Sequence, residues 1–411
     1  MMANDTLLLG VLVALLVGLA AGKAWERYKL RDGHWIDRRK LRQSPHFLQG
    51  LNFLVANQLD HAIDEFGRAA ALNQDAIDIQ IILGALYREK GQVGRAIQTH
   101  QQLLQRPRLG RQEQTAVLLS LGLDYRRGGF VDRALEAFHE VLRLDPDNVQ
   151  ALVNLEKLHE DQHQWREAYD IRTRLARLAP QGERGGHQTI LAFLENELGL
   201  QALRRGDRPE AARHFEAAID LDASVVPAYL NLGDAQAAEG RVAEAVATWE
   251  RLVDVAPERG WLALDRLGEA YARLGVADRR ETLSRRLIES TPHDWRARLA
   301  LANACSARGA HRDALTLLLD ALAVNPHALA LHQAVWRALA GLGFETSAVA
   351  RYIEDSREAI FYRDPHLCLR CHYRSTELLW QCPHCHEWNS FVEERLTPAR
   401  EDGEPGPPGT E

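Results

Sequence analysis

Four of the five cysteines of this chain stand near its carboxyl end as two C-x-x-C pairs, Cys368 with Cys371 and Cys382 with Cys385. Two intervening residues let both thiolates of one tight turn face the same point, and two such turns together offer four sulfurs in a tetrahedron. Zinc or a single iron ion suits that donor set. Two disulfides or a thioredoxin-like redox pair are the alternatives, but redox motifs occur singly on a βα unit, whereas this motif is doubled. The spacing therefore predicts one metal site with these four cysteines as ligands.

The segment around the cysteines changes from a helical pattern to short extended stretches, with Trp380 before the second pair and Trp388 after it. About 30 residues bury too little apolar surface to fold alone, so a metal must supply the missing stability. Residues 357–395 look like a rubredoxin-type zinc ribbon. In rubredoxins a glycine follows the second cysteine of each pair, where the backbone φ tends to be positive, but here the residues are His372 and His386. Histidine tolerates that region less well than glycine, so we expect strain or an altered amide-to-sulfur bond.

The metal itself leaves alternatives open. The spacing does not distinguish zinc from iron. A redox-silent structural ion is favoured over electron transfer, because an electron carrier has no obvious need for a long array of repeats in front of it. A histidine could replace a cysteine as ligand, but four cysteines at the right spacing disfavour this arrangement.

The composition excludes several classes of protein. The chain has 411 residues and a formal net charge of -7, so it lacks the basic excess of a nucleic-acid binder, and we expect no nucleic-acid partner. Only Cys305 lies outside the C-x-x-C pairs, which favours a reducing compartment over a secreted disulfide scaffold. The length allows two or more domains.

The amino-terminal segment predicts a membrane anchor. Seventeen uncharged residues lie between Asp5 and Lys23. As a helix they span ~25 Å, near the lower limit for a bilayer core. A cleaved signal peptide would need a positive amino-terminal region, which the chain lacks. Lysines and arginines follow instead, so the positive-inside rule predicts an uncleaved single-pass anchor over residues 1–22 with a periplasmic N-terminus, then a basic stem over 23–42 and a cytoplasmic remainder.

A pattern with a period of about 34 residues recurs over residues 43–356. A small residue is followed after twelve residues by an alanine, and after four more by an aromatic residue in several copies. The recurring positions are Gly50, Ala62 and Phe66; Gly84 and Ala96; Gly122, Ala134 and Phe138; Gly199, Ala211 and Phe215; Gly233, Ala245 and Trp249; Gly268; and Ala302 and Ala314. A degenerate unit at Leu155, Ala168 and Pro180 completes the series. The small residues let the two helices of a hairpin approach, and we expect the aromatic ring to fill the gap toward the next unit.

This pattern resembles the tetratricopeptide repeat, with eight copies and a ninth helical pair from Leu329 to Ser356 as a cap. The predicted fold class is all-α: a right-handed tetratricopeptide-repeat superhelix with an amino-terminal transmembrane helix, a small carboxyl-terminal rubredoxin-like zinc ribbon, and a disordered tail over 396–411. Such an array offers a concave groove for peptides or protein partners. Two irregularities stand out. Residues 181–187 predict a hinge or a longer loop, and Arg280 replaces an expected alanine, which predicts looser packing.

No set of residues predicts catalysis. The chain has no glycine-rich phosphate loop, no G-x-S-x-G and no H-E-x-x-H, so we expect no enzyme activity, no catalytic residue and no organic cofactor. The histidines of the repeats lack metal-like pairing, and we expect them at the surface: His100, His139, His159, His163 and His214. Cys305 is expected to be a small core side chain.

The order of these segments carries a family resemblance. An anchor, a basic stem, the repeats and a C-x-x-C…W-x-C-P-x-C-x-x-W ribbon follow one another, and up to about residue 395 the chain is similar to the bacterial lipopolysaccharide assembly protein B family. The ribbon residues that carry the resemblance are Cys368, Cys371, Trp380, Cys382, Pro383, Cys385 and Trp388.

The resemblance implies an adaptor, anchored in the bacterial inner membrane, that restrains lipopolysaccharide synthesis. It implies that the cytoplasmic part docks the deacetylase committing precursor to lipid A and presents it to a membrane AAA-type protease. It also implies that the ribbon packs against the repeats, that the four cysteines hold iron or zinc, and that other lipopolysaccharide assembly or transport proteins are candidate partners. Whether the protein forms a homodimer is left open by the resemblance. The alternatives are a general membrane-tethered scaffold or chaperone for envelope complexes and a rubredoxin-like electron carrier.

Overall fold

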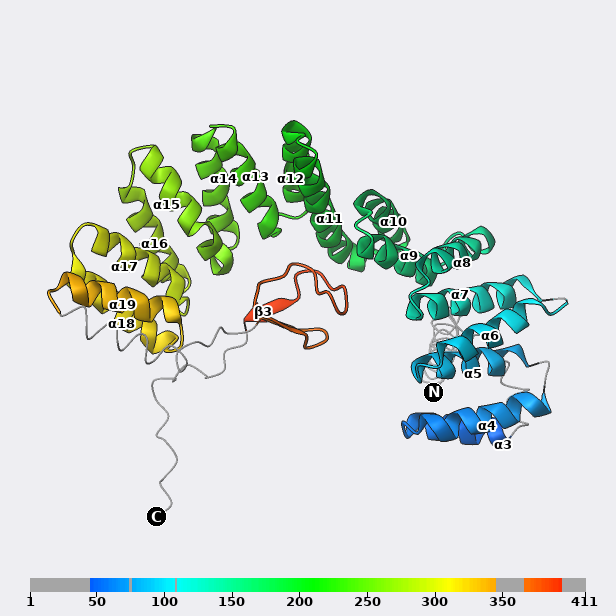
Figure 1. Ribbon diagram of the computed structural model, residues 1–411. Helices are drawn as coiled ribbons and strands as arrows, with labels where there is room; N and C mark the ends of the chain where they lie inside the picture. Colours follow the sequence, from blue (N-terminus) through cyan, green and yellow to red (C-terminus); the bar gives the residue numbers. More distant parts are fainter. Residues whose placement is uncertain (1–44, 74–75, 108, 345–365, 394–411) are drawn as a thin grey trace, which may run out of the picture. The chain divides into compact units, whose positions relative to one another are not determined.

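The computed structural model describes residues 45–73, 76–107, 109–344 and 366–393 (Figure 1). The predicted anchor, stem and tail, and the second helix of the predicted cap, lie outside the described residues. Within the described residues, no helix is long and apolar enough to cross a membrane.

The described chain is mostly helical, with a small sheet near its end. Its helices are α3 (Pro45–Val55), α4 (Leu59–Leu72), α5 (Ile77–Glu89), α6 (Val93–Leu104), α7 (Arg111–Arg127), α8 (Val131–Leu144), α9 (Val149–Asp161), α10 (Trp165–Leu178), the 3₁₀ helix η1 (Gln181–Glu183), α11 (Arg184–Arg204), α12 (Arg208–Leu221), α13 (Val226–Ala238), α14 (Val242–Val255), the 3₁₀ helix η2 (Pro257–Ala263), α15 (Leu264–Arg273), α16 (Asp278–Ser290), α17 (Trp295–Ala307), α18 (His311–Val324) and α19 (Leu329–Gly341). The strands are β1 (His366–Cys368), β2 (Arg374–Ser375) and β3 (Phe391–Glu393).

Successive helices from α3 to α18 pair as hairpins, and α19 follows them (Figure 1). The chain divides into two compact units, one ending at Asn154 and the other beginning at Leu155, so the border falls within α9. The helical repeat fold and the carboxyl-terminal ribbon that the sequence predicts are confirmed.

The small residues of the repeat bring the two helices of each hairpin together. A Cβ added at Gly122 would lie 2.6 Å from the Phe138 ring, and one added at Gly199 would lie 2.5 Å from the Phe215 ring. Both positions therefore require glycine. The alanines of the second helices are all 0 % exposed: Ala62, Ala96, Ala134, Ala168, Ala211, Ala245 and Ala314. The aromatic ring thus covers the glycine of its own hairpin, a role that the spacing argument did not predict.

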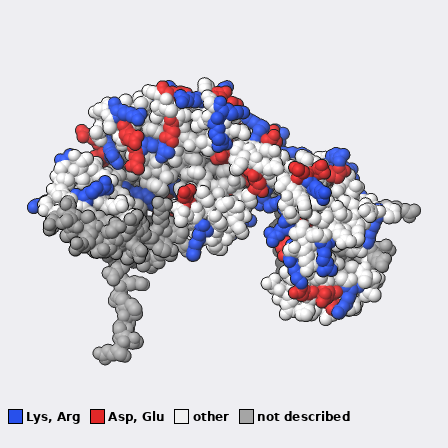
Figure 2. All heavy atoms as spheres, viewed as in Figure 1, with Lys and Arg blue, Asp and Glu red and all other residues white. Residues whose placement is uncertain are grey.

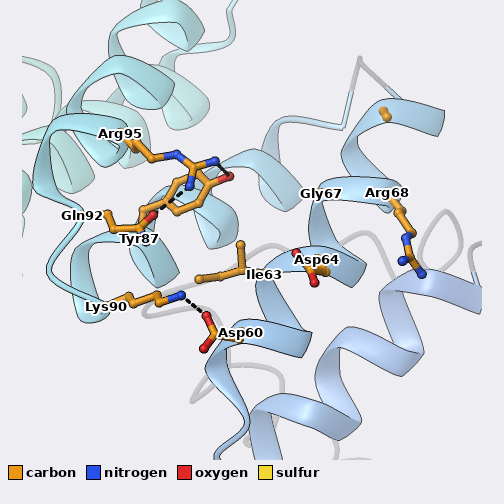
Figure 3. Close-up of a pocket in the computed structure, with 10 residues that line it drawn as sticks. Asp60, Ile63, Asp64, Gly67, Arg68, Tyr87, Lys90, Gln92 and Arg95 are labelled. Carbon is orange, nitrogen blue, oxygen red and sulfur yellow. Dashed lines mark hydrogen bonds and ion pairs between the residues drawn. The ribbon is translucent and has the colours of Figure 1, made fainter.

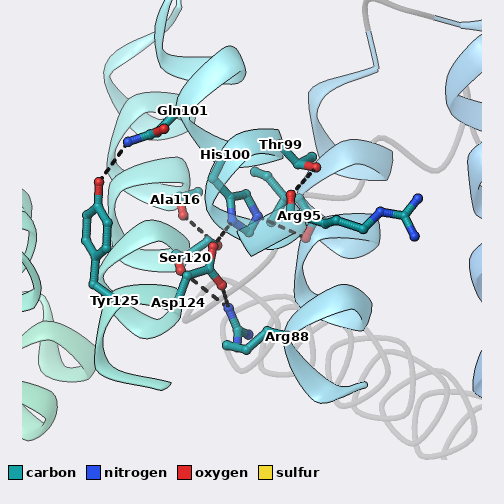
Figure 4. A network of polar contacts seen from close by, with 10 residues as sticks. Arg88, Arg95, Thr99, His100, Gln101, Ala116, Ser120, Asp124 and Tyr125 are labelled. Carbon is teal, nitrogen blue, oxygen red and sulfur yellow. Dashed lines mark hydrogen bonds and ion pairs between the residues drawn. The ribbon is translucent and has the colours of Figure 1, made fainter. Parts of the chain in front are cut away.

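The second hairpin replaces that aromatic ring with His100 (Figure 4). His100 stands sixteen residues after Gly84 and is 0 % exposed. Its Nδ1 lies 2.5 Å from Asp124 Oδ2, and Arg88 Nη1 donates to Asp124 Oδ1 at 2.7 Å. The prediction that the histidines lie at the surface is therefore wrong for His100, and also for His159, which is 9 % exposed. The Asp124 carboxylate on the next helix offsets the free-energy cost of burying the polar His100 imidazole.

The seventh hairpin fills the space over its glycine with the residue at the alanine position. A Cβ added at Gly268 would lie 3.0 Å from the Arg280 guanidinium carbon, so Arg280 covers the glycine as an aromatic ring does elsewhere. Ser284 stands at the aromatic position and is 0 % exposed. The substitution at residue 280 is thus accommodated by a guanidinium that takes the place of a ring.

Residues 181–187 form neither a hinge loop nor a longer connection. They comprise η1 and the first residues of α11, a helix of 21 residues in all. Gly185 and Gly186 meet no other atoms where a Cβ would stand, so each costs roughly 1 kcal/mol in helix propensity. The helix forms because its later turns bury a dense run that includes Leu191 and Leu194.

Charged residues of both signs are interspersed over the face of the molecule shown in Figure 2. Among the described residues on that face, acidic and basic side chains lie close to one another and no broad basic patch gathers. This distribution agrees with the balanced composition.

Candidate metal centre

The ribbon consists of two turns held by a three-stranded antiparallel sheet of order β2-β1-β3. In the first turn the Cys368 amide donates to Tyr373 O, and the His372 amide donates to Cys368 O, both at 2.9 Å. The second turn repeats this pattern at 2.9 Å, with the Cys382 amide donating to Glu387 O and that of His386 donating to Cys382 O. The two C-x-x-C pairs therefore sit on matching backbone frames.

Both histidines that replace glycine adopt the left-handed conformation. The φ of His372 is 60° and that of His386 is 59°. The glycine-like backbone that the rubredoxin pattern requires is kept, at a cost of about 1 kcal/mol for each residue that carries a Cβ. Neither histidine belongs to the cluster of metal-binding atoms found among the described residues, which holds cysteines only.

The four cysteine sulfurs lie within 4.8 Å of one another. The Cys368 and Cys385 sulfurs are 3.7 Å apart, and those of Cys371 and Cys382 are 3.6 Å apart. A disulfide needs about 2.05 Å, and all four cysteines are free thiols. A zinc ion 2.3 Å from each sulfur of a tetrahedron would separate the sulfurs by about 3.8 Å. The cluster therefore has the dimensions of a four-sulfur site for a single metal ion.

The electrostatics of the cluster also fit a cation. Burial opposes ionisation of Cys368, but the Ser390 hydroxyl at 3.2 Å and the amides of Arg370 and Cys371 outweigh it and lower its pKa to about 6. Burial and the adjacent sulfurs raise the pKa of Cys385 to about 12. Four thiolates in so small a volume repel one another, and a divalent cation among them removes that penalty.

The ribbon is held against the repeats by the carboxyl end of α9. Glu160 accepts two hydrogen bonds from the ribbon, from Gln381 Nε2 at 2.8 Å and from Trp388 Nε1 at 3.1 Å. The neighbouring Asp161 lies 2.8 Å from His386 Nδ1. Burial raises the pKa of Glu160, and the Trp388 hydrogen bond opposes that rise. Two adjacent carboxylates thus contact the turn that carries the second C-x-x-C pair and the residues that flank it.

Aromatic rings form the centre of this contact. Trp388 stacks on Phe193 of α11, with ring centroids 5.2 Å apart and an angle of 21° between the planes. Trp388 and Trp165 of α10 pack edge to face, with ring centroids 6.4 Å apart. The ring centroids of Trp380 and Phe193 are also 6.4 Å apart. Both tryptophans of the ribbon pattern therefore pack onto the repeats as well as flanking the second cysteine pair.

Two arginines hold the opposite edge of the ribbon. Arg259 of η2 donates from Nη2 to the Phe391 carbonyl at 3.1 Å. Arg296 of α17 donates from Nη2 to Glu393 Oε1 at 2.6 Å, and its guanidinium lies 4.2 Å from the centroid of Trp261. The ribbon therefore contacts hairpins that are far apart in the sequence, from α9 to α17.

Sequence reasoning missed these docking residues, although a signal was present. The fourth hairpin was the most degenerate copy, because it places Glu156 and Arg172 where other hairpins place a glycine and an aromatic ring. The two changes stand sixteen residues apart, the spacing of a contact within a hairpin. Glu160 follows one turn after Glu156 on α9. Charges at these core positions mark the hairpin that receives the ribbon.

Comparison with known proteins agrees with both parts of the architecture. Residues 366–393 match the family described as rubredoxin metal binding domain. Residues 81–115, 119–181 and 196–260 match tetratricopeptide repeat families.

Relatives span nearly the whole chain. The chain is 27 % identical over 387 residues to lipopolysaccharide assembly protein B of Escherichia coli K12, which covers 92 % of this chain and 97 % of that protein. It is 26 % identical over 396 residues to the protein of that name from Haemophilus influenzae, with the same coverage. Among solved structures, the Cut9–Hcn1 hetero-tetramer of the APC/C matches 74 % of this chain and 57 % of that chain at 17 % identity, with a TM-score of 0.30. With tetratricopeptide repeats followed by a metal-binding ribbon, the chain is similar over nearly its whole length to the lipopolysaccharide assembly protein B family.

Proposed function

We propose that this protein is a tetratricopeptide-repeat adaptor that modulates lipopolysaccharide biosynthesis. The observation that carries the proposal is the docked ribbon, whose contacts with Glu160, Phe193 and Arg296 join it to the repeats as one binding surface. Relatives that span nearly the whole chain are named for lipopolysaccharide assembly. The adaptor acts by binding rather than by catalysis.

The ribbon holds one metal ion, and the proposed ligands are Cys368, Cys371, Cys382 and Cys385. Zinc fits best, because the sulfur separations agree with a tetrahedral zinc site and four thiolates leave no open coordination position for chemistry. Iron has the same donor preference and is the alternative. When bound, the ion supplies the folding free energy that so small a domain lacks. The Ser390 hydroxyl and the backbone amides of Arg370 and Cys371 orient and stabilise the Cys368 thiolate.

The proposed partners are the lipid A deacetylase and a membrane AAA-type protease. The protein would be held in the bacterial inner membrane by residues 1–22, with the repeats and the ribbon in the cytoplasm. A shared membrane plane raises the effective concentration of adaptor and protease, so individually weak contacts suffice.

The test is deletion of the gene in the host bacterium, with the half-life of the deacetylase and the lipopolysaccharide content as readouts. Deletion should lengthen the half-life and raise the lipopolysaccharide content, and the wild-type gene should reverse both effects. Trp388→Ala removes the Phe193 stack and a Glu160 donor, so it should restore the phenotype poorly. Glu377→Gln changes an exposed ribbon residue outside these contacts and should restore it fully.

Unchanged deacetylase levels after deletion would contradict the proposal. Capture from membranes that recovers many unrelated envelope proteins and no protease would favour a general scaffold. An iron-loaded protein with a reversible change in visible absorbance on reduction would favour an electron carrier.

A further inference from the structure

A tyrosine and an arginine meet at the same position of several hairpin junctions. At the junction of α14 with α15 and α16, Tyr271 donates its hydroxyl to Glu250 Oε1 at 2.6 Å. Arg279 lies over the Tyr271 ring, 5.5 Å from its centroid, and pairs with Glu250 Oε1 at 2.8 Å. A carboxylate from the preceding hairpin therefore bridges a tyrosine hydroxyl and a guanidinium.

The junction of α6 with α7 and α8 has the same plan. Gln101 donates from Nε2 to the Tyr125 hydroxyl oxygen at 2.9 Å, and Arg133 lies 5.9 Å from the Tyr125 ring centroid. Gln101 and Glu250 occupy equivalent positions, because each stands five residues after the buried alanine of its helix. In both junctions a long polar side chain reaches from the preceding hairpin to the tyrosine.

The first junction, between α4 and the α5–α6 hairpin, keeps the tyrosine and the arginine but lacks that side chain (Figure 3). Arg95 lies 4.2 Å from the Tyr87 ring centroid and donates from Nη2 to its hydroxyl at 3.0 Å. The residue five positions after Ala62 is Gly67, and nothing lies within 4 Å of where its Cβ would stand. An open cavity of about 550 Å³ takes the place of the missing side chain.

The charges around the cavity favour an acidic group at the tyrosine end. Among the described residues, no carboxylate pairs with Arg95, whose Nη1 donates to Gln92 Oε1 at 2.8 Å. Lys90 is paired with Asp60. Asp64 also lines the cavity, and it repels an anion and attracts a cation. Tyr87 and Arg95 thus stand at the repeat positions that Tyr271 and Arg279 occupy beside Glu250, with Arg95 closer to its ring than Arg279 is.

We propose that this cavity, lined by Gly67, Tyr87 and Arg95, binds the carboxylate of a glutamate side chain from a partner protein. The inserted side chain takes the place that Glu250 fills within the chain at the later junction. It accepts from the Tyr87 hydroxyl and from the guanidinium of Arg95, both of which are charge-assisted hydrogen bonds. The site lies in the unit that ends at Asn154 and needs neither the metal nor the ribbon, so it goes beyond the adaptor role proposed above.

The experiment uses the full chain with ¹³C-labelled isoleucine methyl groups, because Ile63 lines the cavity. Its methyl signal is assigned with Ile63→Val. The probes are three blocked tripeptides, acetyl-Ala-Glu-Ala-amide and its Gln and Lys counterparts, titrated to about 10 mM, since a single side chain binds weakly. The Glu peptide should shift the Ile63 signal in a saturable manner, and the Gln peptide should bind roughly tenfold more weakly.

Three variants and one matched control, Gly67→Lys, make the result specific. Arg95→Gln should weaken binding of the Glu peptide about tenfold, and Asp64→Asn should strengthen it, because a like charge is removed. Gly67→Glu should fill the cavity, abolish peptide binding and raise the unfolding midpoint above that of Gly67→Lys, which gains the same helix propensity without the carboxylate.

Two results would overturn the proposal. In the first, the Glu peptide leaves the Ile63 signal unmoved or binds no better than the Gln peptide. In the second, the Lys peptide binds best and Asp64→Asn weakens it, which would make the cavity a cation site.

Discussion

Glu156 and Arg172 form a bidentate ion pair, with Arg172 Nε 2.5 Å from Glu156 Oε1 and Nη2 2.6 Å from Oε2. They stand where Gly122 and Phe138 stand in the preceding hairpin. The Glu156 side chain is 1 % exposed and that of Arg172 is 15 % exposed. The fourth hairpin is therefore joined by an ion pair where its neighbour is joined by a ring on a glycine.

Exchange of the pair for the contact used elsewhere should be tolerated. Glu156→Gly or Arg172→Phe alone leaves a buried partner uncompensated and should cost about 3 kcal/mol. The double variant Glu156→Gly with Arg172→Phe should lie within about 1.5 kcal/mol of the wild type, because a well-packed apolar contact often replaces a buried ion pair without loss. Chemical denaturation of all four proteins gives the coupling energy. A double variant as unstable as the sum of the single losses would refute this account.

The pH dependence of stability should carry a signature of Glu156. Burial raises the pKa of Glu156 to about 7 from 4.5, against the opposing effect of Arg172. The unfolded chain therefore releases this proton at lower pH than the folded chain does, so stability falls as the pH rises from about 4.5 to about 7. The loss is at most about 3 kcal/mol. Glu156→Gln removes this titration, so the stability of the variant relative to the wild type should increase over that window.

The readout is the difference in unfolding free energy between the two proteins at pH 5 and at pH 7.5. The comparison cancels titrations that both proteins share, including those of the cysteine thiols. A difference that is constant with pH would show that Glu156 does not titrate in this range.

Removal of the metal should unfold the ribbon and leave the helices in place. A strong chelator should abolish the hydrogen-exchange protection of the Cys368 and Cys382 amides, both of which are hydrogen-bonded at 2.9 Å within their knuckles. The far-ultraviolet circular dichroism should hardly change, since the helices make contacts of their own. Retained protection of both amides after measured loss of the metal would contradict a folding role for the ion.

The two left-handed histidines should respond differently to glycine. His372→Gly relieves the backbone strain at φ 60° and should stabilise the ribbon by about 1 kcal/mol. His386→Gly relieves equal strain but deletes the contact with Asp161, so its gain should be smaller or absent. Thermal unfolding of the metal-bound proteins measures both effects. Equal gains would show that the His386–Asp161 contact adds nothing to stability.

The sequence predicted the parts of the fold that rest on spacing. The interval from Gly122 to Ala134 predicted a helical hairpin, and the C-x-x-C pairs predicted the clustering of four sulfurs. Neither inference needs knowledge of distant parts of the chain, because each contact lies within one hairpin or one pair of turns. The backbone expected at His372 and His386 followed from the same local argument.

Features that depend on a neighbouring element escaped prediction. The burial of His100 depends on Asp124, which stands one helix further on, and no local pattern reveals that partner. The position of the ribbon depends on Glu160 and Arg296, which both reach it only because the hairpins stack on one another. Residues 181–187 look like a loop by composition, but burial along the rest of α11 keeps them helical.

The ribbon contacts have a mechanical consequence. A repeat array is elastic, because each hairpin touches only its neighbours and small rotations add along it. The ribbon is hydrogen-bonded to Glu160 of α9 and to Arg296 of α17, so it connects distant points of that elastic array. Bending there must strain the ribbon, so the stretch from α9 to α17 is stiffer than the repeats alone. Metal occupancy thereby sets the compliance of this part of the protein.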